Sequence, residues 1–392
     1  MLTLDYGAKF DPARDEDFFA ALPPQPAVCL VEPKAASAQP LFIRTQDLRG
    51  RMERLLGKPD PTSKRLNLRE FAEGVRYRLT ASTFEQTFAY YQQAKALFPD
   101  RYVEMLRMRR PAVLKINLRT AYPRCFSTRR ISLDSNGEPT GGIYYGPFPS
   151  RKAADAFAER VLDLFKVRRC QIKILRDPAY PGCIYSEMKM CLAPCFAGCT
   201  KEEYDIEVGR LVSFLETNGG SLRESLASER DRASEGMDFE KAALLHKKLD
   251  KLDDALRGQP ELPRRLQELN AVVFQRGLAE QSIAVYQVHG GRIVEPFEIS
   301  FGTLAGEPRS AEQFLREQIE QAVSLPASDL SENLWLLGRW FYSSPREGEI
   351  FFRGNAWPYR KMMRACARLL APPDAAAEQG GKSAESSGEK SS

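Results

Sequence analysis

The sequence lacks three features that would place it in a specialised class. Its 392 residues contain no apolar run near the roughly 20 residues that a membrane-spanning helix needs. The N-terminus has no signal-peptide hydrophobic region, so we expect a cytoplasmic protein without a membrane partner. The formal net charge of +5 argues only weakly for a nucleic-acid partner. What remains is an ordinary globular composition, 43% hydrophobic and 28% charged, long enough for several compact units.

Cysteine is concentrated in one stretch. Five of the eight cysteines lie within residues 170–199, on segments whose prolines disfavour helix and allow thiols to converge. Disulfides are not expected in a long chain without a secretory signal, whereas reduced structural thiols remain an alternative. The stretch has no C-x2-C or C-x4-C pair of the kind that structural zinc uses, and uneven spacing suits an iron–sulfur cluster equally well. Spacing alone leaves zinc and iron–sulfur open.

Positive charge is concentrated between residues 101 and 130, where Glu104 is the lone carboxylate between Arg101 and the C-terminal end of the segment. Tyr102, Tyr122 and Phe126 are interleaved with the basic residues, a mixture typical of surfaces that bind phosphates and pack on sugars or bases. A solvated basic face is the alternative interpretation. The basic residues are Arg101, Arg107, Arg109, Arg110, Lys115, Arg119, Arg124, Arg129 and Arg130.

Hydrophobic periodicity predicts a multidomain α+β protein. Asn136–Gly137 indicates a β-hairpin within 111–150, and Ser150 is a candidate N-cap for the helix after it. Composition predicts a disordered tail from Pro372. The other expected elements are a helix near 15–20, strands at 27–32 and 41–45, helices at 48–56 and 83–99, helices through 201–257, and strands with a helix across 268–325.

Four short motifs carry a family resemblance: YYGPFPS at 144–150, RRCQ at 168–171, PGCIY at 181–185 and MKMCLAPC at 188–195. Together they resemble the cysteine region of the UvrC family of ABC excinuclease components. The resemblance implies a [4Fe–4S] cluster, with zinc as the alternative metal, held by Cys170, Cys183, Cys191 and Cys195. Cys199 has no counterpart in the motif and is expected to be a bystander.

FDP at 10–12 and LPPQPAVCLVE at 22–32 resemble the GIY-YIG nuclease module that opens the UvrC family. Matched position by position, its two tyrosines fall on Cys29 and Phe42, and its phosphate-steadying arginine falls on Arg51. Its metal-binding glutamate falls near Tyr90, while Glu85 matches an earlier glutamate. Without a metal carboxylate the family's mechanism fails, so we expect a degenerate nuclease fold.

A helical stripe follows, containing Met237, Phe239, Ala242, Ala243, Leu245, Leu249 and Leu252, and such stripes are usually core. Its sequence also resembles the UVR motif, a helical hairpin that pairs with the helicase subunit UvrB. In this chain His246-Lys247-Lys248 replaces the usual Arg-Asp of the motif. The resemblance implies a UvrB-like partner contacted by Phe239, Glu240, Ala242 and Ala243.

The second half resembles the start of the family's RNase H-like nuclease, which needs aspartates and a histidine for two-metal chemistry. Between Gly258 and Ala371 the sequence offers only Asp329 and His289.

In the GIY-YIG-like segment, the glycine that follows the module's second strand is replaced by Arg44. As candidate DNA contacts we select Arg49, Lys115, Arg124, Arg129 and Arg130.

The resemblance divides the chain into a degenerate GIY-YIG-like domain (1–110), a β-hairpin and cysteine-cluster region (111–200), a helical UVR region (201–258), a partial RNase H-like α/β domain (259–371) and the tail (372–392). The leading hypothesis is a UvrC-like excision-repair protein that binds DNA and a UvrB-like partner without incising.

Two alternatives stay open beside that hypothesis. One is an active endonuclease that uses Mg²⁺ at a rearranged site of Tyr90 or Tyr91, Glu85, Arg51 and Tyr6. The other is a structural or redox-sensing iron–sulfur protein that uses the same scaffold.

Overall fold

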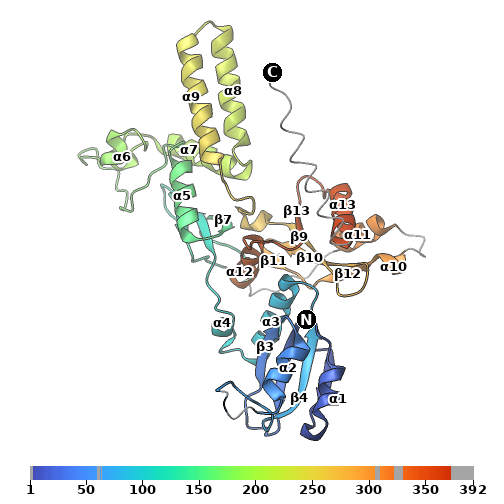
Figure 1. Ribbon diagram of the computed structural model, residues 1–392. Coiled ribbons are helices and arrows are strands. Elements are labelled where there is room, and N and C mark those ends of the chain that lie inside the picture. Colours follow the sequence, from blue (N-terminus) through green and yellow to red (C-terminus); the bar gives the residue numbers. More distant parts are fainter. Residues whose placement is uncertain (1–2, 60–61, 63, 305–309, 322–329, 372–392) are drawn as a thin grey trace.

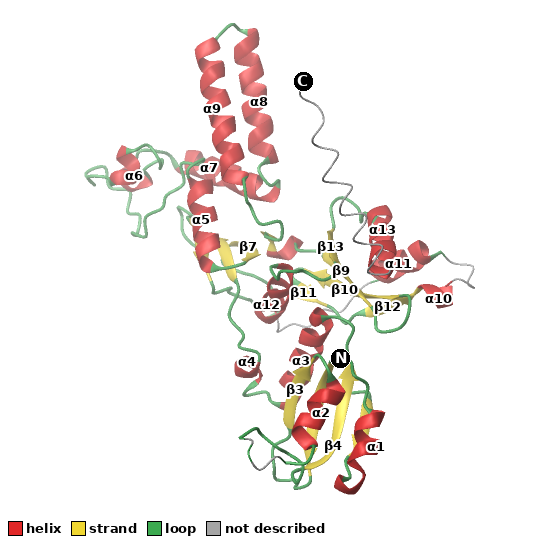
Figure 2. Cartoon of the chain, in the orientation of Figure 1, coloured by secondary structure: helices red, strands yellow, loops and turns green. Residues whose placement is uncertain are grey.

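The computed structural model describes residues 3–59, 62, 64–304, 310–321 and 330–371. It is a mixed α/β molecule with three antiparallel sheets and a projecting helical hairpin (Figures 1 and 2). The expected disordered tail, 372–392, lies outside the described residues, as does Asp329.

The N-terminal unit is a four-stranded antiparallel sheet in the order β1-β4-β2-β3. Alternate residues of β2 are buried on both faces, so the sheet is covered on both sides. Helices α1 and α2 pack on one face and α3 on the other. The elements are β1 (Tyr6–Lys9), a 3-10 turn (Pro12–Arg14), α1 (Asp15–Ala21), β2 (Ala27–Pro33), β3 (Leu41–Thr45), α2 (Leu48–Leu56), β4 (Ala72–Leu79), α3 (Thr83–Leu97) and α4 (Tyr102–Met105).

The predicted helices and strands of this unit are confirmed, but two strands were not predicted. β1 and β4 flank one another, and β4 lies in the interior of the sheet beside β2. Before α1, Asp11 caps the 3-10 turn by accepting from the Ala13 N–H, 2.9 Å away.

The middle unit is built around β5, which pairs with β6 on one side and β7 on the other. The predicted hairpin is therefore wrong in its pairing: β6 and β7 each bind β5. The Asn136–Gly137 turn forms, with Gly137 at φ 78°, closed by the single bridge Leu133–Pro139. The elements are β5 (Ala112–Ile116), β6 (Cys125–Thr128), β7 (Ile143–Phe148), α5 (Arg151–Leu162), α6 (Ile184–Glu187), a 3-10 turn (Pro194–Phe196) and α7 (Lys201–Glu216).

Local hydrogen bonds fix where the helices of the middle unit begin. The Ser150 side chain accepts from the Ala153 N–H at 3.1 Å, which confirms the predicted cap of α5. Thr200 and Glu203 form a capping box at the start of α7. After Gly219, at φ 86°, the chain enters a hairpin of α8 (Gly220–Glu235) and α9 (Phe239–Leu256), which projects from the molecule in Figure 1. The helical prediction for 201–257 is confirmed.

The C-terminal unit is a five-stranded antiparallel sheet in which β10 pairs with β9, β11 and β12, and β13 pairs with β9. Helices α11 and α13 pack on one face and α12 on the other. Before this sheet, β8 (Arg264–Arg265) pairs with β7 as the fourth strand of the middle sheet. The elements that follow are a 3-10 turn (Leu266–Glu268), β9 (Ala271–Arg276), β10 (Ser282–His289), β11 (Arg292–Ile293), β12 (Phe297–Ser300), α10 (Phe301–Leu304), α11 (Ala311–Glu320), α12 (Leu330–Phe341), β13 (Glu349–Phe352) and α13 (Tyr359–Leu370).

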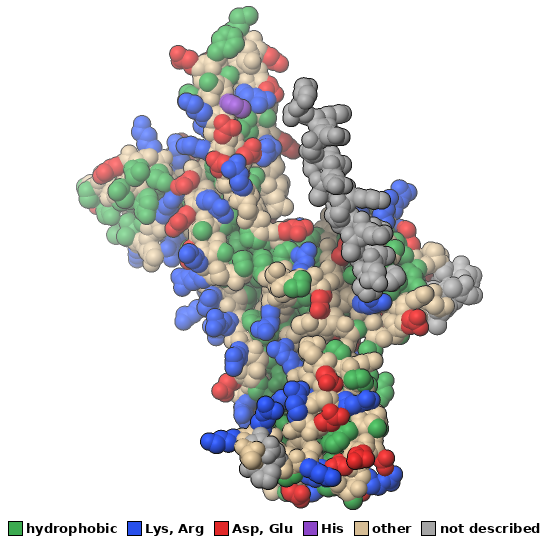
Figure 3. All heavy atoms as spheres, in the orientation of Figure 1, with side chains coloured by type: hydrophobic (Ala, Val, Ile, Leu, Met, Phe, Trp, Pro, Cys, Tyr) green, Lys and Arg blue, Asp and Glu red, His purple; other side chains and the backbone are tan. Residues whose placement is uncertain are grey.

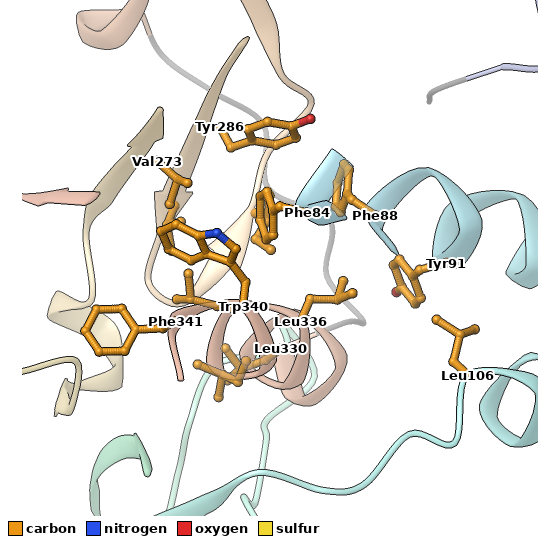
Figure 4. Packing of buried hydrophobic residues seen from close by; sticks show 14 of the residues in the cluster. Phe84, Phe88, Tyr91, Leu106, Val273, Tyr286, Leu330, Leu336, Trp340 and Phe341 are labelled. Carbon is orange, nitrogen blue, oxygen red and sulfur yellow. The ribbon is translucent and has the colours of Figure 1, made fainter. Parts of the chain in front are cut away.

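Helix α12 joins the three units. It contacts α3 of the N-terminal unit, β7 of the middle unit and β11 of its own sheet. Phe84 of α3 packs edge-on against Tyr286 of β10, with 4.9 Å between ring centroids, and at a tilt against Trp340 of α12, with 5.3 Å between them (Figure 4). The Tyr342 hydroxyl donates to the Pro147 carbonyl at 2.9 Å. The domains therefore share one hydrophobic cluster.

A buried arginine adds a second joint. Arg292 of β11 is fully buried, donates to the Gly137 carbonyl and forms an ion pair with Glu138 at 3.1 Å. The Asn136–Gly137 turn thus docks the middle unit onto the C-terminal sheet, a role that its sequence did not indicate.

We predict that Glu332→Ala loosens the α12 joint. The Glu332 carboxylate accepts from Tyr91 at 2.5 Å, Tyr102 at 2.6 Å and Lys95 at 2.8 Å. Because the variant leaves three donors without this acceptor, it should lower the free energy of unfolding by about 2 kcal/mol. Urea denaturation measures the change. The control is Glu224→Ala on the exposed face of α8, and equal effects of the two variants would contradict the prediction.

Candidate functional site

The pairing of β2 with β3 decides whether the GIY-YIG-like residues can form one site. Cys29 lies opposite Ile43, and Leu30 lies opposite Phe42. Successive side chains of a strand point to opposite faces, so Cys29 packs with α1 and α2 while Phe42 packs with α3. Cys29 and Phe42, the positions matched to the two nuclease tyrosines, therefore lie on opposite faces of the sheet. Burial raises the pKa of Cys29 to about 12, against the opposing charge of Arg51, so this thiol is a core residue.

Arg51 and Tyr90 do meet, at the free edge of β3. They line a pocket of about 180 Å³ together with Ile43, Arg44 and Trp335 of α12, and with Met105 and Leu106. Tyr90 stacks on Phe42 at 4.6 Å, and its hydroxyl donates to the Phe42 carbonyl at 3.3 Å. Burial raises the pKa of Tyr90, with the charge of Arg44 opposing the rise. We call this the edge pocket.

Sequence reasoning treated Arg44 only as a substituted glycine and left the aromatic residues of α12 unassigned. The structure places both Arg44 and Trp335 at the edge pocket. Trp335 comes from a helix almost 300 residues away in the chain, so only the tertiary fold could reveal it. For Arg44 the sequence offered one indication of a functional role, because a charged residue replaces the glycine of the nuclease motif after its second strand.

Glu85 lies away from the edge pocket. Its carboxylate accepts from the Ala81 N–H at 2.9 Å and lies 3.7 Å from the Arg78 guanidinium. Burial raises the pKa of Glu85, with the Ala81 N–H and Arg78 opposing it, and the carboxylate belongs to the start of α3. It is not among the pocket-lining residues.

The other residues of the rearranged site are also dispersed. Tyr6 stacks on Tyr77 at 5.4 Å at the opposite edge of the sheet. The Tyr91 hydroxyl is bound to Glu332. The set of Tyr6, Glu85 and Arg51 is therefore not assembled in this structure.

The cysteine-rich segment is an irregular loop anchored by Arg168. This buried side chain donates to the Tyr122 carbonyl at 2.9 Å and the Ile172 carbonyl at 2.8 Å, and its Nη1 lies 3.8 Å from the Cys170 Sγ. Cys183 precedes α6, and Cys195 lies in the second 3-10 turn between Ala193 and Ala197, both at positive φ. At these kinks the loop turns back on itself. A hydrogen bond from the Asp177 N–H to the Cys195 carbonyl, at 2.9 Å, joins two segments of the loop.

The four predicted ligand thiols act on one another electrostatically. Burial is the main reason that the pKa of Cys191 rises to about 11; the Ala193 N–H, 3.3 Å from its Sγ, opposes the rise, and the other three ligand cysteines add to it. Cys199 instead lies in the hydrophobic cluster with Tyr204. Within the described ranges, no three His, Cys, Asp or Glu side chains are grouped closely enough to hold a metal ion. The donor chemistry fits an iron–sulfur cluster, while the loop as it stands is more open than a ligand cage.

The predicted DNA-binding residues fall into two groups. Arg49 donates to the Leu22 carbonyl at 2.7 Å and so closes the end of α1. Lys115 is buried with its Nζ 4.9 Å from the centre of the Tyr144 ring, and Arg124 lies over Phe126 at 4.2 Å. These three side chains have structural contacts. Arg129 and Arg130 are exposed. Figure 3 shows that Lys and Arg side chains gather along one side of the molecule.

The predicted core stripe of α9 is only half correct. Leu245, Leu249 and Leu252 are buried against α8 and α5, but Met237 and Phe239 are 78% and 70% exposed. Glu240 and Ala243 are exposed too, and Ala242 is partly buried. The tip of the hairpin therefore presents apolar side chains to solvent (Figure 3).

Comparison with known proteins fits this geometry. Residues 112–214 match the model of the UvrC/Cho excinuclease middle domain, which covers β5 to α7 and the whole cysteine loop. The chain is 27% identical to UvrABC system protein C of Ruminiclostridium cellulolyticum over 55% of its own length and 34% of that protein.

Two further relatives extend the match. UvrABC system protein C of Clostridium tetani is 23% identical over 81% of this chain and 51% of that protein, and that of Chlamydia caviae is 26% identical over 75% and 48%. The chain belongs to the UvrC family as a divergent member. It spans about a third to a half of these UvrC proteins. No solved structure matches it.

His289, the histidine that the sequence offers for RNase H-like chemistry, lies at the end of β10. His289 is half-buried, and its Nε2 lies 2.8 Å from the Gln287 Oε1. Burial lowers the pKa of His289, and the nearby charge of Arg353 lowers it further. Across the described part of the chain, no helix has both the length and the apolar character to cross a membrane.

Proposed function

We propose that the protein is an excision-repair component that binds DNA and a UvrB-like helicase subunit without incising DNA itself. The observation that carries this proposal is the composition of the edge pocket. Its lining keeps the phosphate-steadying Arg51 and adds Arg44, but includes no carboxylate. A metal-dependent nuclease needs a carboxylate to hold the ion that polarises the phosphodiester.

The rearranged-nuclease alternative has one observation in its favour. Tyr90 and Arg51, two members of its proposed set, line the same pocket. It still requires Glu85 to supply the metal ligand, and that carboxylate is held by Arg78 and the Ala81 N–H. The geometry therefore favours binding over cleavage.

Two surfaces support the proposed partners. Exposed arginines attract the phosphates of DNA whatever its sequence. They include Arg107 and Arg109, between α4 and β5, and Arg129 and Arg130, after β6. The hairpin tip, with Phe239 exposed, supplies an apolar surface on which a UvrB-like helical hairpin could pack.

The cofactor is part of the proposal. Cys170, Cys183, Cys191 and Cys195 would hold a [4Fe–4S] cluster, and Arg168, beside Cys170, would place a positive charge near it. When bound, the cluster supplies either a structural cross-link of the loop or a redox centre. A structural or redox-sensing role alone would be indicated by weak duplex affinity that does not vary with oxidation state.

We predict that the protein binds a lesion-bearing duplex but leaves both strands intact. Anaerobically purified protein, mixed with UvrA, UvrB, ATP and Mg²⁺, should shift the duplex in a gel without producing nicked strands, because the edge pocket has no metal carboxylate. Nicking that disappears in Glu85→Gln and Arg51→Ala would overturn the proposal in favour of the rearranged nuclease.

We predict that the four ligand cysteines, and not Cys199, hold iron. Serine replacement of Cys170, Cys183, Cys191 or Cys195 should abolish the brown absorbance and the bound iron and sulfide of anaerobic protein, because each removes one thiolate ligand. Cys199→Ser is the matched control and should keep both. One equivalent of zinc without sulfide in the wild-type protein would establish the zinc alternative.

We predict that Phe239→Ala weakens binding of UvrB about tenfold without changing the melting temperature. An exposed aromatic residue adds little to folding but can act as an interface anchor. Calorimetric titration with UvrB measures the affinity. Lys247→Ala, on the exposed face of the same helix, is the control; equal affinities for the two variants would place the partner surface elsewhere.

A further inference from the structure

We propose that the cleft between the N-terminal unit and α12 is a phosphate-binding site formed by Arg44 and Arg339, with Arg51 also in its lining. The choice of a nucleic-acid strand as the source of the phosphate rests on the proposed function. Arg44 replaces the glycine of the nuclease motif, and Arg339 lies in the C-terminal unit, so the site belongs to this chain's own arrangement.

Two adjoining pockets define the cleft. The edge pocket, about 180 Å³, is lined by Arg44, Arg51 and Trp335. A second pocket of about 200 Å³ is lined by Thr87, Arg339 and Trp340, among others. The Arg44 Nη1 donates to the Thr87 Oγ1 at 3.2 Å, so a single hydrogen bond spans the boundary between the pockets.

Aromatic rings hold both guanidinium groups. Arg44 lies 5.9 Å from the centre of the Tyr90 ring, and Arg339 lies 5.4 Å from that of Trp335. Both arginines remain exposed to solvent. A guanidinium that packs one face on an aromatic ring keeps the N–H groups along its edge free to donate. These N–H groups form the two parallel hydrogen bonds with which arginine binds an oxyanion.

Positive charge outweighs negative charge among the residues that line the cleft, with Arg44, Arg51 and Arg339 against Glu347. Within the described residues Arg44, Arg51 and Arg339 have no ion pair within 4.0 Å. Glu347 lines the second pocket, but its carboxylate accepts from the Thr83 N–H at 2.9 Å and the Thr83 hydroxyl at 3.2 Å. Partial burial lowers the pKa of Arg44, and the charge of Arg339 lowers it further. An anion between the two arginines would relieve this repulsion.

Phosphate fits these surroundings better than an isolated carboxylate. A phosphate group offers several oxygens to guanidinium groups that approach from two domains. Tyr90 and the half-buried Trp335 border the same cleft, and aromatic rings beside a basic groove are typical of sites for single-stranded nucleic acid. A free nucleotide or inorganic phosphate presents the same chemistry, so the experiment must separate these sources.

The test measures binding of a fluorescein-labelled 12-nucleotide single strand by anisotropy, on the full-length protein. Arg44→Gln and Arg339→Gln should each weaken binding about tenfold and reduce the dependence of affinity on salt by about one unit of slope. Arg44→Lys should recover only part of the affinity, because lysine keeps the positive charge but lacks the planar pair of N–H donors with which a guanidinium binds two oxygens. Arg316→Gln is the matched control: this exposed arginine also lies over an aromatic ring, Tyr359 at 4.3 Å, but lines neither pocket.

A parallel arm records melting temperature with inorganic phosphate. If the oligonucleotide does not bind but phosphate stabilises wild type and not Arg44→Gln or Arg339→Gln, the site stands and the DNA-binding function fails. If all variants bind the oligonucleotide as wild type does, the site is overturned and DNA binding resides elsewhere. Absence of both responses overturns the site and the DNA-binding proposal together. Melting curves without ligand confirm that each variant is folded.

Discussion

The packing of α12 is the constraint on which the rest of the structure depends. One face of this helix buries Leu334, Leu337 and Trp340, and it does so against three different partners: the C-terminal sheet, β7 and α3. Each unit alone would expose an apolar face there, and association removes these faces from water together. The aromatic contacts of Phe84 with Tyr286 and Trp340 add directional packing to this burial.

The same packing determines what the nuclease-like unit can do. Because α12 lies against α3, its residues Trp335 and Arg339 reach the free edge of β3, where an isolated GIY-YIG-like unit would have solvent. The edge therefore becomes a basic, aromatic cleft between domains. Glu85, the available carboxylate of α3, is turned instead toward Arg78 and the start of its own helix. The tertiary contact and the position of Glu85 away from the edge pocket are both consistent with the proposed binding without cleavage.

Local patterns predicted much of the fold, and non-local contacts account for what was missed. The strands at Ala27–Pro33 and Leu41–Thr45 and the cap at Ser150 followed from apolar runs and a short polar side chain. β4 was missed although Val75, Tyr77 and Leu79 alternate with Arg76 and Arg78, the period of a strand. β8 could not have been predicted, since its two residues pair with β7 across more than a hundred intervening residues.

The candidate site was predictable only where one residue carries the information. The clustered cysteines and Arg51 could be selected by residue type and position, whereas the faces on which Cys29 and Phe42 lie depend on register. A strand alternates its faces at every residue, so an alignment that is one residue off in a loop moves a side chain to the opposite face of the sheet. Cys29 is consequently a core thiol, and the two arginines proposed to bind phosphate come from β3 and α12. A chain that keeps its scaffold but changes which side chains reach a sheet edge can retain affinity for phosphate while losing hydrolysis.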